Sequence, residues 1–148
     1  MNQSLIEHLR KYARLKDSIE VERFEATLNQ IAELKDARYI GPLLEFLDDK
    51  CRFPEVMFSI VHTVEAFEHE AYVAGILASL PRLWQSSPYW ATVIHVAILN
   101  TQSVLEIYRS QLALAPGPVK QAARELLTRI RNTKPKFGER CDQLLAIP

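Results

Sequence analysis

The stretch at residues 45–70 reads EFLDDKCRFPEVMFSIVHTVEAFEHE and decides the fold. Pro54 suits the first position of a helix, where its missing N–H costs nothing, and Glu55 suits the positive end of the helix dipole. Beyond them, apolar residues cover most of the helix circumference: Val56, Met57, Phe58, Ile60, Val61, Val64 and Phe67. A helix that is apolar nearly all round is usually buried, so this pattern predicts a buried central helix.

One polar stripe remains on this predicted helix. At about 100° per residue, a single arc holds Glu55, Ser59, His62, Thr63, Ala66 and Glu70. The stretch also contains seven acids against two bases, a net charge of −5; the acids are Glu45, Asp48, Asp49, Glu55, Glu65, Glu68 and Glu70. A polar stripe framed by carboxylates predicts a binding groove rather than a catalytic pocket.

Length and composition indicate an ordinary soluble protein. The chain has 148 residues, which favours a single domain over residues 1–148, and 18 basic residues balance 18 acidic ones. The balance is uneven, because residues 71–148 carry nine bases against four acids. The two cysteines, Cys51 and Cys141, form no metal-type spacing and are expected to be reduced thiols. We find neither a secretory signal nor a membrane-length apolar run, so we expect a cytoplasmic protein.

Helical spacing runs through almost the whole sequence and predicts an all-α fold. We expect eight or nine short helices, with Ser4 capping the first and Asp17 the second. Predicted helix starts recur every 15 to 18 residues, at Asp36, Pro54, Ala71, Pro88, Ser103 and Pro118. Pairs of such helices match the length of helical-pair repeats, which favours antiparallel pairs in an irregular HEAT-like solenoid. A compact helical bundle is the alternative.

The sequence offers little evidence of catalysis. Phosphate-binding loops and nucleophile elbows are absent, so we expect no enzyme activity and no cofactor. A metal site from His62, Glu65 and His69 is one alternative, and His95 is expected to be a buried histidine bonded to a neighbour. A second alternative is a nucleic-acid binder or scaffold that uses a basic C-terminal face, formed by Arg124, Arg129, Arg131, Lys134 and Lys136.

Residues 39–68 carry a family resemblance. A leucine-rich short helix, an Asp-Asp corner, a cysteine and the segment PEVMFSIVHTVE together resemble the Immunity protein 30 family. Members are small helical bacterial proteins encoded beside polymorphic toxins, including contact-dependent growth inhibition systems. The resemblance implies a cytoplasmic antidote that binds and neutralises a cognate toxin domain, and it supplies no catalytic residues.

Charge adds a more specific expectation about the partner. Many delivered toxins are nucleases with basic active sites, which a carboxylate-framed groove would complement. We predict that the partner-binding residues are Asp48, Asp49, Glu55, Ser59, His62, Glu65, Glu68 and Glu70. We expect a monomer or weak dimer that binds the toxin's C-terminal domain, with neither membrane nor nucleic acid as its ligand.

Overall fold

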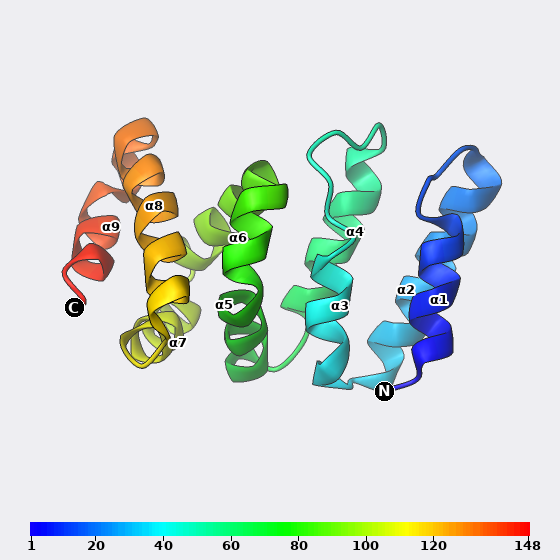
Figure 1. Cartoon of the computed structure of the whole chain (residues 1–148), viewed down its shortest axis with the longest axis horizontal. Helices are drawn as coiled ribbons and strands as arrows, with labels where there is room; N and C mark the ends of the chain where they lie inside the picture. The colour runs from blue at the N-terminus through cyan, green and yellow to red at the C-terminus, as the bar shows by residue number, and fades with distance from the viewer. The chain divides into compact units, whose positions relative to one another are not determined.

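A computed structural model describes all of residues 1–148, and every regular element in it is helical (Figure 1). The nine α-helices and two short 3-10 helices are α1 (Gln3–Tyr12), α2 (Ser18–Leu34), η1 (Ala37–Tyr39), α3 (Ile40–Leu44), α4 (Pro54–Glu65), α5 (His69–Ser86), α6 (Pro88–Leu99), α7 (Gln102–Ala113), α8 (Gly117–Thr133), η2 (Pro135–Phe137) and α9 (Gly138–Leu145). The all-α prediction is therefore confirmed. Helices α4 to α8 begin within two residues of the predicted starts. None of the helices is both long and apolar enough to cross a membrane.

The chain forms two compact units, residues 1–72 and 73–148, and α5 begins in the first and continues into the second. Each unit has its own set of packed helices. That the whole chain behaves as one domain stays a prediction.

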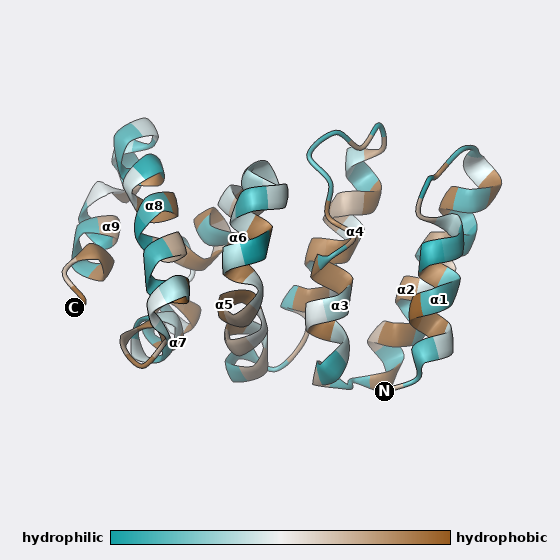
Figure 2. Ribbon diagram, viewed as in Figure 1, coloured by the Kyte–Doolittle hydropathy of each residue, from teal (hydrophilic) through white to brown (hydrophobic).

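Unit 1, residues 1–72, consists of paired helices. Figure 1 shows α1 and α2 running in opposite directions, and α3 and α4 likewise. Helix α2 packs against α1 and α4, and α3 packs against α4. This pairing is compatible with the predicted HEAT-like arrangement. Figure 2 shows hydrophobic and hydrophilic residues side by side along α1 and α2, whereas the loop that precedes α4 is hydrophilic.

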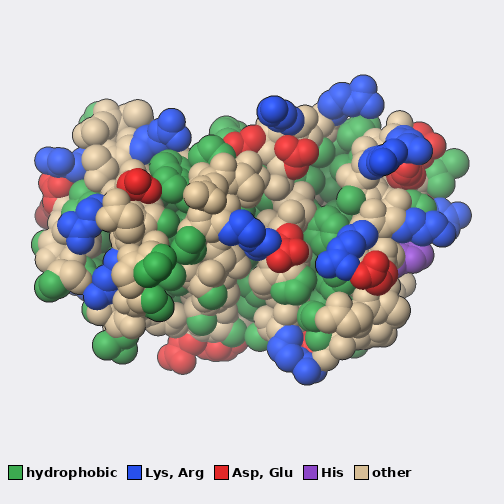
Figure 3. Space-filling model, in the orientation of Figure 1, with side chains coloured by type: hydrophobic (Ala, Val, Ile, Leu, Met, Phe, Trp, Pro, Cys, Tyr) green, Lys and Arg blue, Asp and Glu red, His purple; other side chains and the backbone are tan.

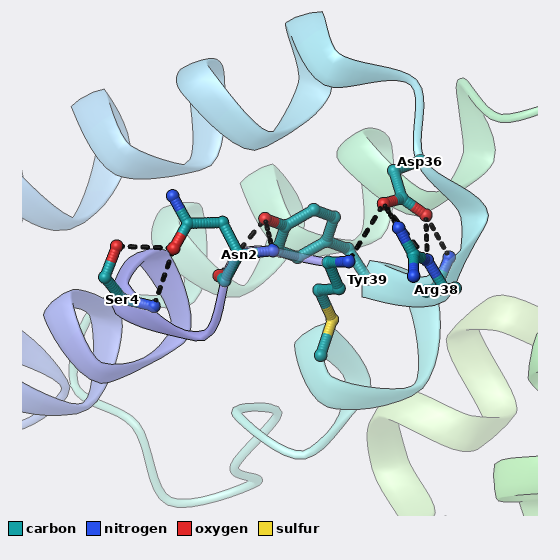
Figure 4. A network of polar contacts seen from close by, with 6 residues as sticks. Asn2, Ser4, Asp36, Arg38 and Tyr39 are labelled. Carbon is teal, nitrogen blue, oxygen red and sulfur yellow. Dashed lines mark hydrogen bonds and ion pairs between the residues drawn. The ribbon is translucent and has the colours of Figure 1, made fainter.

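Side-chain caps fix the starts of the first two helices. Asp17 caps α2 as predicted, its carboxylate accepting from the Glu20 N–H at 2.9 Å. The prediction for α1 was wrong by two residues, because Asn2 rather than Ser4 accepts the capping bond. The Tyr39 hydroxyl lies 2.8 Å from the Asn2 N–H and 3.2 Å from its carbonyl oxygen (Figure 4). These bonds join the start of α1 to η1.

Helix α4 is the buried central helix of unit 1. Pro54 occupies its first turn, and Val56, Met57, Ile60, Val61 and Val64 are buried. Two expectations about it were wrong. Phe58 is 39% exposed rather than buried. The helix also ends at Glu65, so Glu70 belongs to the first turn of α5 and not to the polar stripe of α4.

Unit 2, residues 73–148, is built around α6 and α8, which pack against each other. Helix α7 covers α6, and α9 covers α8. The apolar positions of α8 recur at helical spacing, and all of them are buried: Val119, Ala122, Ala123, Leu126, Leu127 and Ile130. Pro81 lies inside α5, which continues to Ser86, so this proline does not end the helix. Both cysteines are free.

His95 is the buried histidine of unit 2, as predicted. Its Nδ1 lies 2.8 Å from the Ala91 carbonyl oxygen, and its Nε2 lies 2.9 Å from the Tyr108 hydroxyl. Because a carbonyl only accepts, Nδ1 carries the hydrogen and Nε2 accepts from Tyr108. Burial lowers the pKa of His95 to about 4, because the imidazolium would lose its hydration.

This histidine predicts a loss of stability in mild acid. Its pKa in the folded state lies below the ordinary value near 6.5. Between these two pKa values, His95 is therefore protonated in the unfolded chain and neutral in the folded chain. The His95 contribution to stability is therefore complete above pH 6.5 and is lost as the pH falls towards 4, by about 3 kcal/mol. Urea unfolding at pH 7 and pH 4 measures it. In the His95→Gln variant, the free energy of unfolding should depend less on pH than in the wild type. An unchanged pH dependence would mean that His95 does not cause the loss of stability in acid.

Candidate binding surface

The two units carry opposite net charges. Unit 1 has 14 carboxylate side chains against nine Lys and Arg, a net −5, whereas unit 2 has four against nine, a net +5. Residues 45–70 alone have the same net charge of −5, so the rest of unit 1 is neutral. A net charge of this size attracts a basic partner and speeds its approach.

All eight predicted binding residues belong to unit 1, but they do not form one cluster. They fall into three groups: Asp48 and Asp49 in the loop before α4; Glu55, Ser59, His62 and Glu65 on α4; and Glu68 and Glu70 at the start of α5. A helix of 12 residues is about 18 Å long, so the first and last groups lie at opposite ends of α4.

The exposed stripe of α4 brings together three residue types that suit a protein interface. Glu55 and His62 are exposed, and Ser59 between them is half-buried. Phe58 lies beside His62, with 6.2 Å between the ring centroids. Exposed aromatic side chains are frequent anchors of protein–protein interfaces, so Phe58 is a candidate that the sequence reading placed in the core.

Glu25 of α2 is a further member of this surface that the sequence did not reveal. The Ser59 hydroxyl donates to Glu25 Oε1 at 2.8 Å, and the Glu55 carbonyl oxygen lies 3.0 Å from the same hydroxyl. Ser59 therefore holds a carboxylate of α2 against α4. We call Glu25, Glu55, Phe58, Ser59 and His62 the α4 face.

Glu65 lies at the edge of the α4 face and is half-buried. Burial raises the pKa of its carboxyl group, and nearby His62 partly opposes this shift. The pKa of Tyr72 is also raised, chiefly by burial and further by the charge of Glu65. Glu65 therefore lies beside Tyr72 and is less accessible to a partner than Glu55.

Two of the predicted acids have local structural roles. The Asp48 carboxylate accepts from the Lys50 N–H at 2.9 Å, which closes a turn. The Glu68 carboxylate accepts from the N–H groups of Glu70 at 3.1 Å and Ala71 at 3.3 Å, at the start of α5. These bonds give Asp48 and Glu68 structural roles that do not depend on a toxin.

A hollow of about 420 Å³ lies at the C-terminal end of α4. Glu68 and Thr63 line it together with Lys35, and the remaining lining is apolar: Ala32, Ala37, Ala66, Phe67 and Ala71. Of the eight predicted binding residues, Glu68 alone lines this hollow.

The basic C-terminal face is largely paired within unit 2. Arg131 Nε lies 2.6 Å from an Asp142 carboxylate oxygen. Arg129 stacks over the Trp84 ring at 5.4 Å, and Lys136 lies 5.5 Å from the centroid of the Phe137 ring. Only Arg124 and Lys134 of the five predicted cations have no such partner, which weakens the case for a phosphate-binding face. His62, Glu65 and His69 do not form a group that could hold a metal ion.

The comparisons with known proteins agree with the pattern at residues 39–68. The family model described as Immunity protein 30 matches residues 11–108. Searches of the curated proteins and of the solved structures find no match. The matched segment includes all of α2 to α6 and therefore the whole α4 face. Because the match covers well over half of the chain, this protein belongs to the Immunity protein 30 family.

Proposed function

We propose that this protein binds a cognate toxin domain and neutralises it without catalysis, through the α4 face. The family supplies the general role of an immunity protein. We choose this surface because Glu55, Phe58 and His62 are exposed on a helix whose other faces are largely buried. The helix also belongs to a unit of net charge −5.

The chemistry of the α4 face favours a basic partner. The Glu25 carboxylate accepts from Ser59, Glu55 is an exposed acid in the first turn of α4, and Phe58 offers an apolar ring beside His62. Nuclease active sites bind phosphates and are rich in Lys and Arg, so a nuclease domain is the toxin class that fits best. Interfaces of this kind combine a desolvated aromatic anchor with charged groups that steer the encounter.

The site of action follows from the role. A toxin delivered into a bacterial cell attacks targets in the cytoplasm, and we propose that the antidote acts there. Of the other sites considered, the basic face of unit 2 offers few unpaired cations, and the histidine–glutamate set on α4 and α5 is not assembled. Neither is retained as a second function.

Co-expression tests this function. The toxin domain to use is the C-terminal domain of the large secreted protein that the neighbouring gene is expected to encode. Cells that produce this domain should grow only when the wild-type protein is present, and the two purified proteins should form a complex whose association slows as salt is added. Growth arrest that persists in the presence of the protein, with no complex in titration calorimetry, would contradict the proposal.

A further inference from the structure

A second hollow of about 410 Å³ lies at the other end of unit 1, between the loop that joins α1 to α2 and the loop that precedes α4. Its lining residues come from both loops: Ala13, Arg14, Leu15, Asp48, Lys50, Cys51, Arg52 and Phe53. We call this hollow the basic hollow, because three of these residues are cationic and only Asp48 is acidic. Figure 3 shows Lys and Arg side chains along this edge of unit 1.

The three cations of the basic hollow have no partner inside the protein. Arg14, Lys50 and Arg52 are exposed, and none of them forms an ion pair or stacks on a ring. This contrasts with unit 2, where Arg129, Arg131 and Lys136 each contact an acidic or aromatic side chain. Three unpaired cations around one hollow are unexpected in a unit of net charge −5, and they create a local field of the opposite sign.

Leu15 holds one side of the basic hollow in place. Its backbone adopts a left-handed conformation, with φ of 50°, which is unfavourable for a residue with a β-carbon. The side chain is only 2% exposed, and its burial offsets this cost. The buried leucine therefore anchors the loop beside Arg14, so that the guanidinium is presented from a fixed backbone.

The residues that line the basic hollow indicate whether it would hold a phosphate or a protein carboxylate. Phosphate sites generally offer unpaired backbone N–H groups, but six of the eight lining residues already use theirs. Ala13 and Leu15 donate to carbonyls of α1, and Cys51 donates to the Asp48 carbonyl. The others donate to side chains: Lys50 to Asp48, Asp48 to Met57 and Phe53 to Cys51. Only the N–H groups of Arg14 and Arg52 are left, so the side-chain cations are the main groups available to hold an anion.

The remaining lining favours a carboxylate of a protein. The negative charge of Asp48 repels a dianionic phosphate more strongly than a carboxylate of single charge. Arginine binds carboxylates through two parallel N–H bonds, and Phe53 and Ala13 offer apolar contact to the stem of a side chain. A glutamate or aspartate side chain on the surface of a partner protein meets all of these conditions.

We propose that the basic hollow receives an acidic side chain of the toxin domain. This inference rests on the proposed function and deepens it, because the loop before α4 leads directly to Glu55 of the α4 face. A basic region of the toxin would lie against the α4 face while a neighbouring carboxylate enters the hollow. Adjacent contacts of opposite sign fix the orientation of two proteins, and they discriminate against toxins whose charges are arranged differently.

Neutralising the cations tests this assignment. The variant Arg14→Gln, Lys50→Gln, Arg52→Gln should bind the toxin domain at least about tenfold more weakly than the wild-type protein. A matched control, Arg124→Gln, Lys134→Gln, Lys136→Gln, removes the same formal charge from unit 2 and should bind like the wild type. Circular dichroism and thermal unfolding check that both variants are folded. A folded hollow variant that binds with wild-type affinity would overturn the proposal.

Cys51 provides a test that needs no variant. This thiol lines the basic hollow and is half-buried, whereas Cys141 is fully buried and serves as an internal control. Binding of the toxin domain should slow alkylation of Cys51 by iodoacetamide at least about tenfold, since an occupied hollow excludes the reagent. A complex that leaves this rate unchanged would show that the hollow is empty.

The same alkylation assay separates the two kinds of anion and the two proposals. Millimolar inorganic phosphate alone should not protect Cys51, and protection equal to that by the toxin domain would make the hollow a phosphate site and refute the carboxylate assignment. A wild-type protein that does not bind the toxin domain at all overturns the proposed function and this inference with it. Binding without protection of Cys51 overturns this inference alone.

Discussion

The double substitution Asp49→Lys, Glu55→Lys should weaken binding to the toxin domain at least about hundredfold, because the contact of Glu55 on the α4 face becomes repulsive and the acidic charge of Asp49 in the adjoining loop is reversed. Both side chains are exposed, and they lie in the loop before α4 and in its first turn. Loss of the favourable interaction of Glu55 with the helix dipole costs about 0.3–1 kcal/mol, which leaves the protein folded. Asp48 is spared, since its carboxylate holds the turn at Lys50. Titration calorimetry measures the affinity, and stopped-flow mixing measures the association rate.

The control for this charge reversal lies in unit 2. Arg124→Glu with Lys134→Glu changes the net charge by the same amount in the opposite direction, at two exposed cations without an ion pair. This control should retain binding to the toxin domain. If it loses binding while the Asp49 and Glu55 variant keeps it, the functional surface is the basic face of unit 2.

Two substitutions on α4 should separate stability from binding. Ile60 is fully buried, so Ile60→Ala removes three carbon atoms from the core and should lower the free energy of unfolding by about 2–5 kcal/mol. Phe58 is 39% exposed, so Phe58→Ala should change stability far less while costing about 2 kcal/mol or more in binding, as a central aromatic anchor does. Urea unfolding and titration calorimetry measure the two quantities.

The outcome at each position has a clear meaning. A loss below about 0.5 kcal/mol for Ile60→Ala would mean that α4 is not the buried centre of unit 1. Unchanged toxin binding by Phe58→Ala would remove the aromatic anchor from the proposed interface. Because the two residues lie two positions apart on the same helix, a general distortion of α4 would affect both measurements in both variants.

Local rules predicted much of the fold. Pro54 marks the start of α4, and Asp17 caps α2, because both signals act within one turn of the chain. The apolar positions of α8 are buried at the predicted spacing. Periodicity could not identify Phe58 as exposed. On a helix that is apolar nearly all round, only the placement of the neighbouring helices decides which apolar residue stays outside.

The predicted end of α4 was wrong, because the polar stripe continued past the true end of the helix. The polar stripe was extended to Glu70, but the chain leaves the helix after Glu65, and the Glu68 carboxylate bonds the first N–H groups of α5. A capping glutamate before a new helix is a weak signal, since Ser, Thr, Asp and Asn are the usual caps. The division of charge, by contrast, was visible in the sequence and agrees with the boundary between the two units.

The candidate site could be predicted only in part. Glu55, Ser59 and His62 share one face because they share one helix. Glu25 joins them from 34 residues away, and the basic hollow combines a loop near residue 14 with one near residue 50. Such neighbours depend on how helices pack, and no spacing rule along the sequence connects them.

Site-specific photo-crosslinking tests the central claim most directly, namely that the toxin domain binds the α4 face. A benzoylphenylalanine at His62, an exposed position on that face, should crosslink to the toxin domain on illumination. The same probe at Arg124, exposed on α8 of unit 2, should not. Crosslinking from position 124 and none from position 62, by variants that both still bind the toxin domain, would contradict the account.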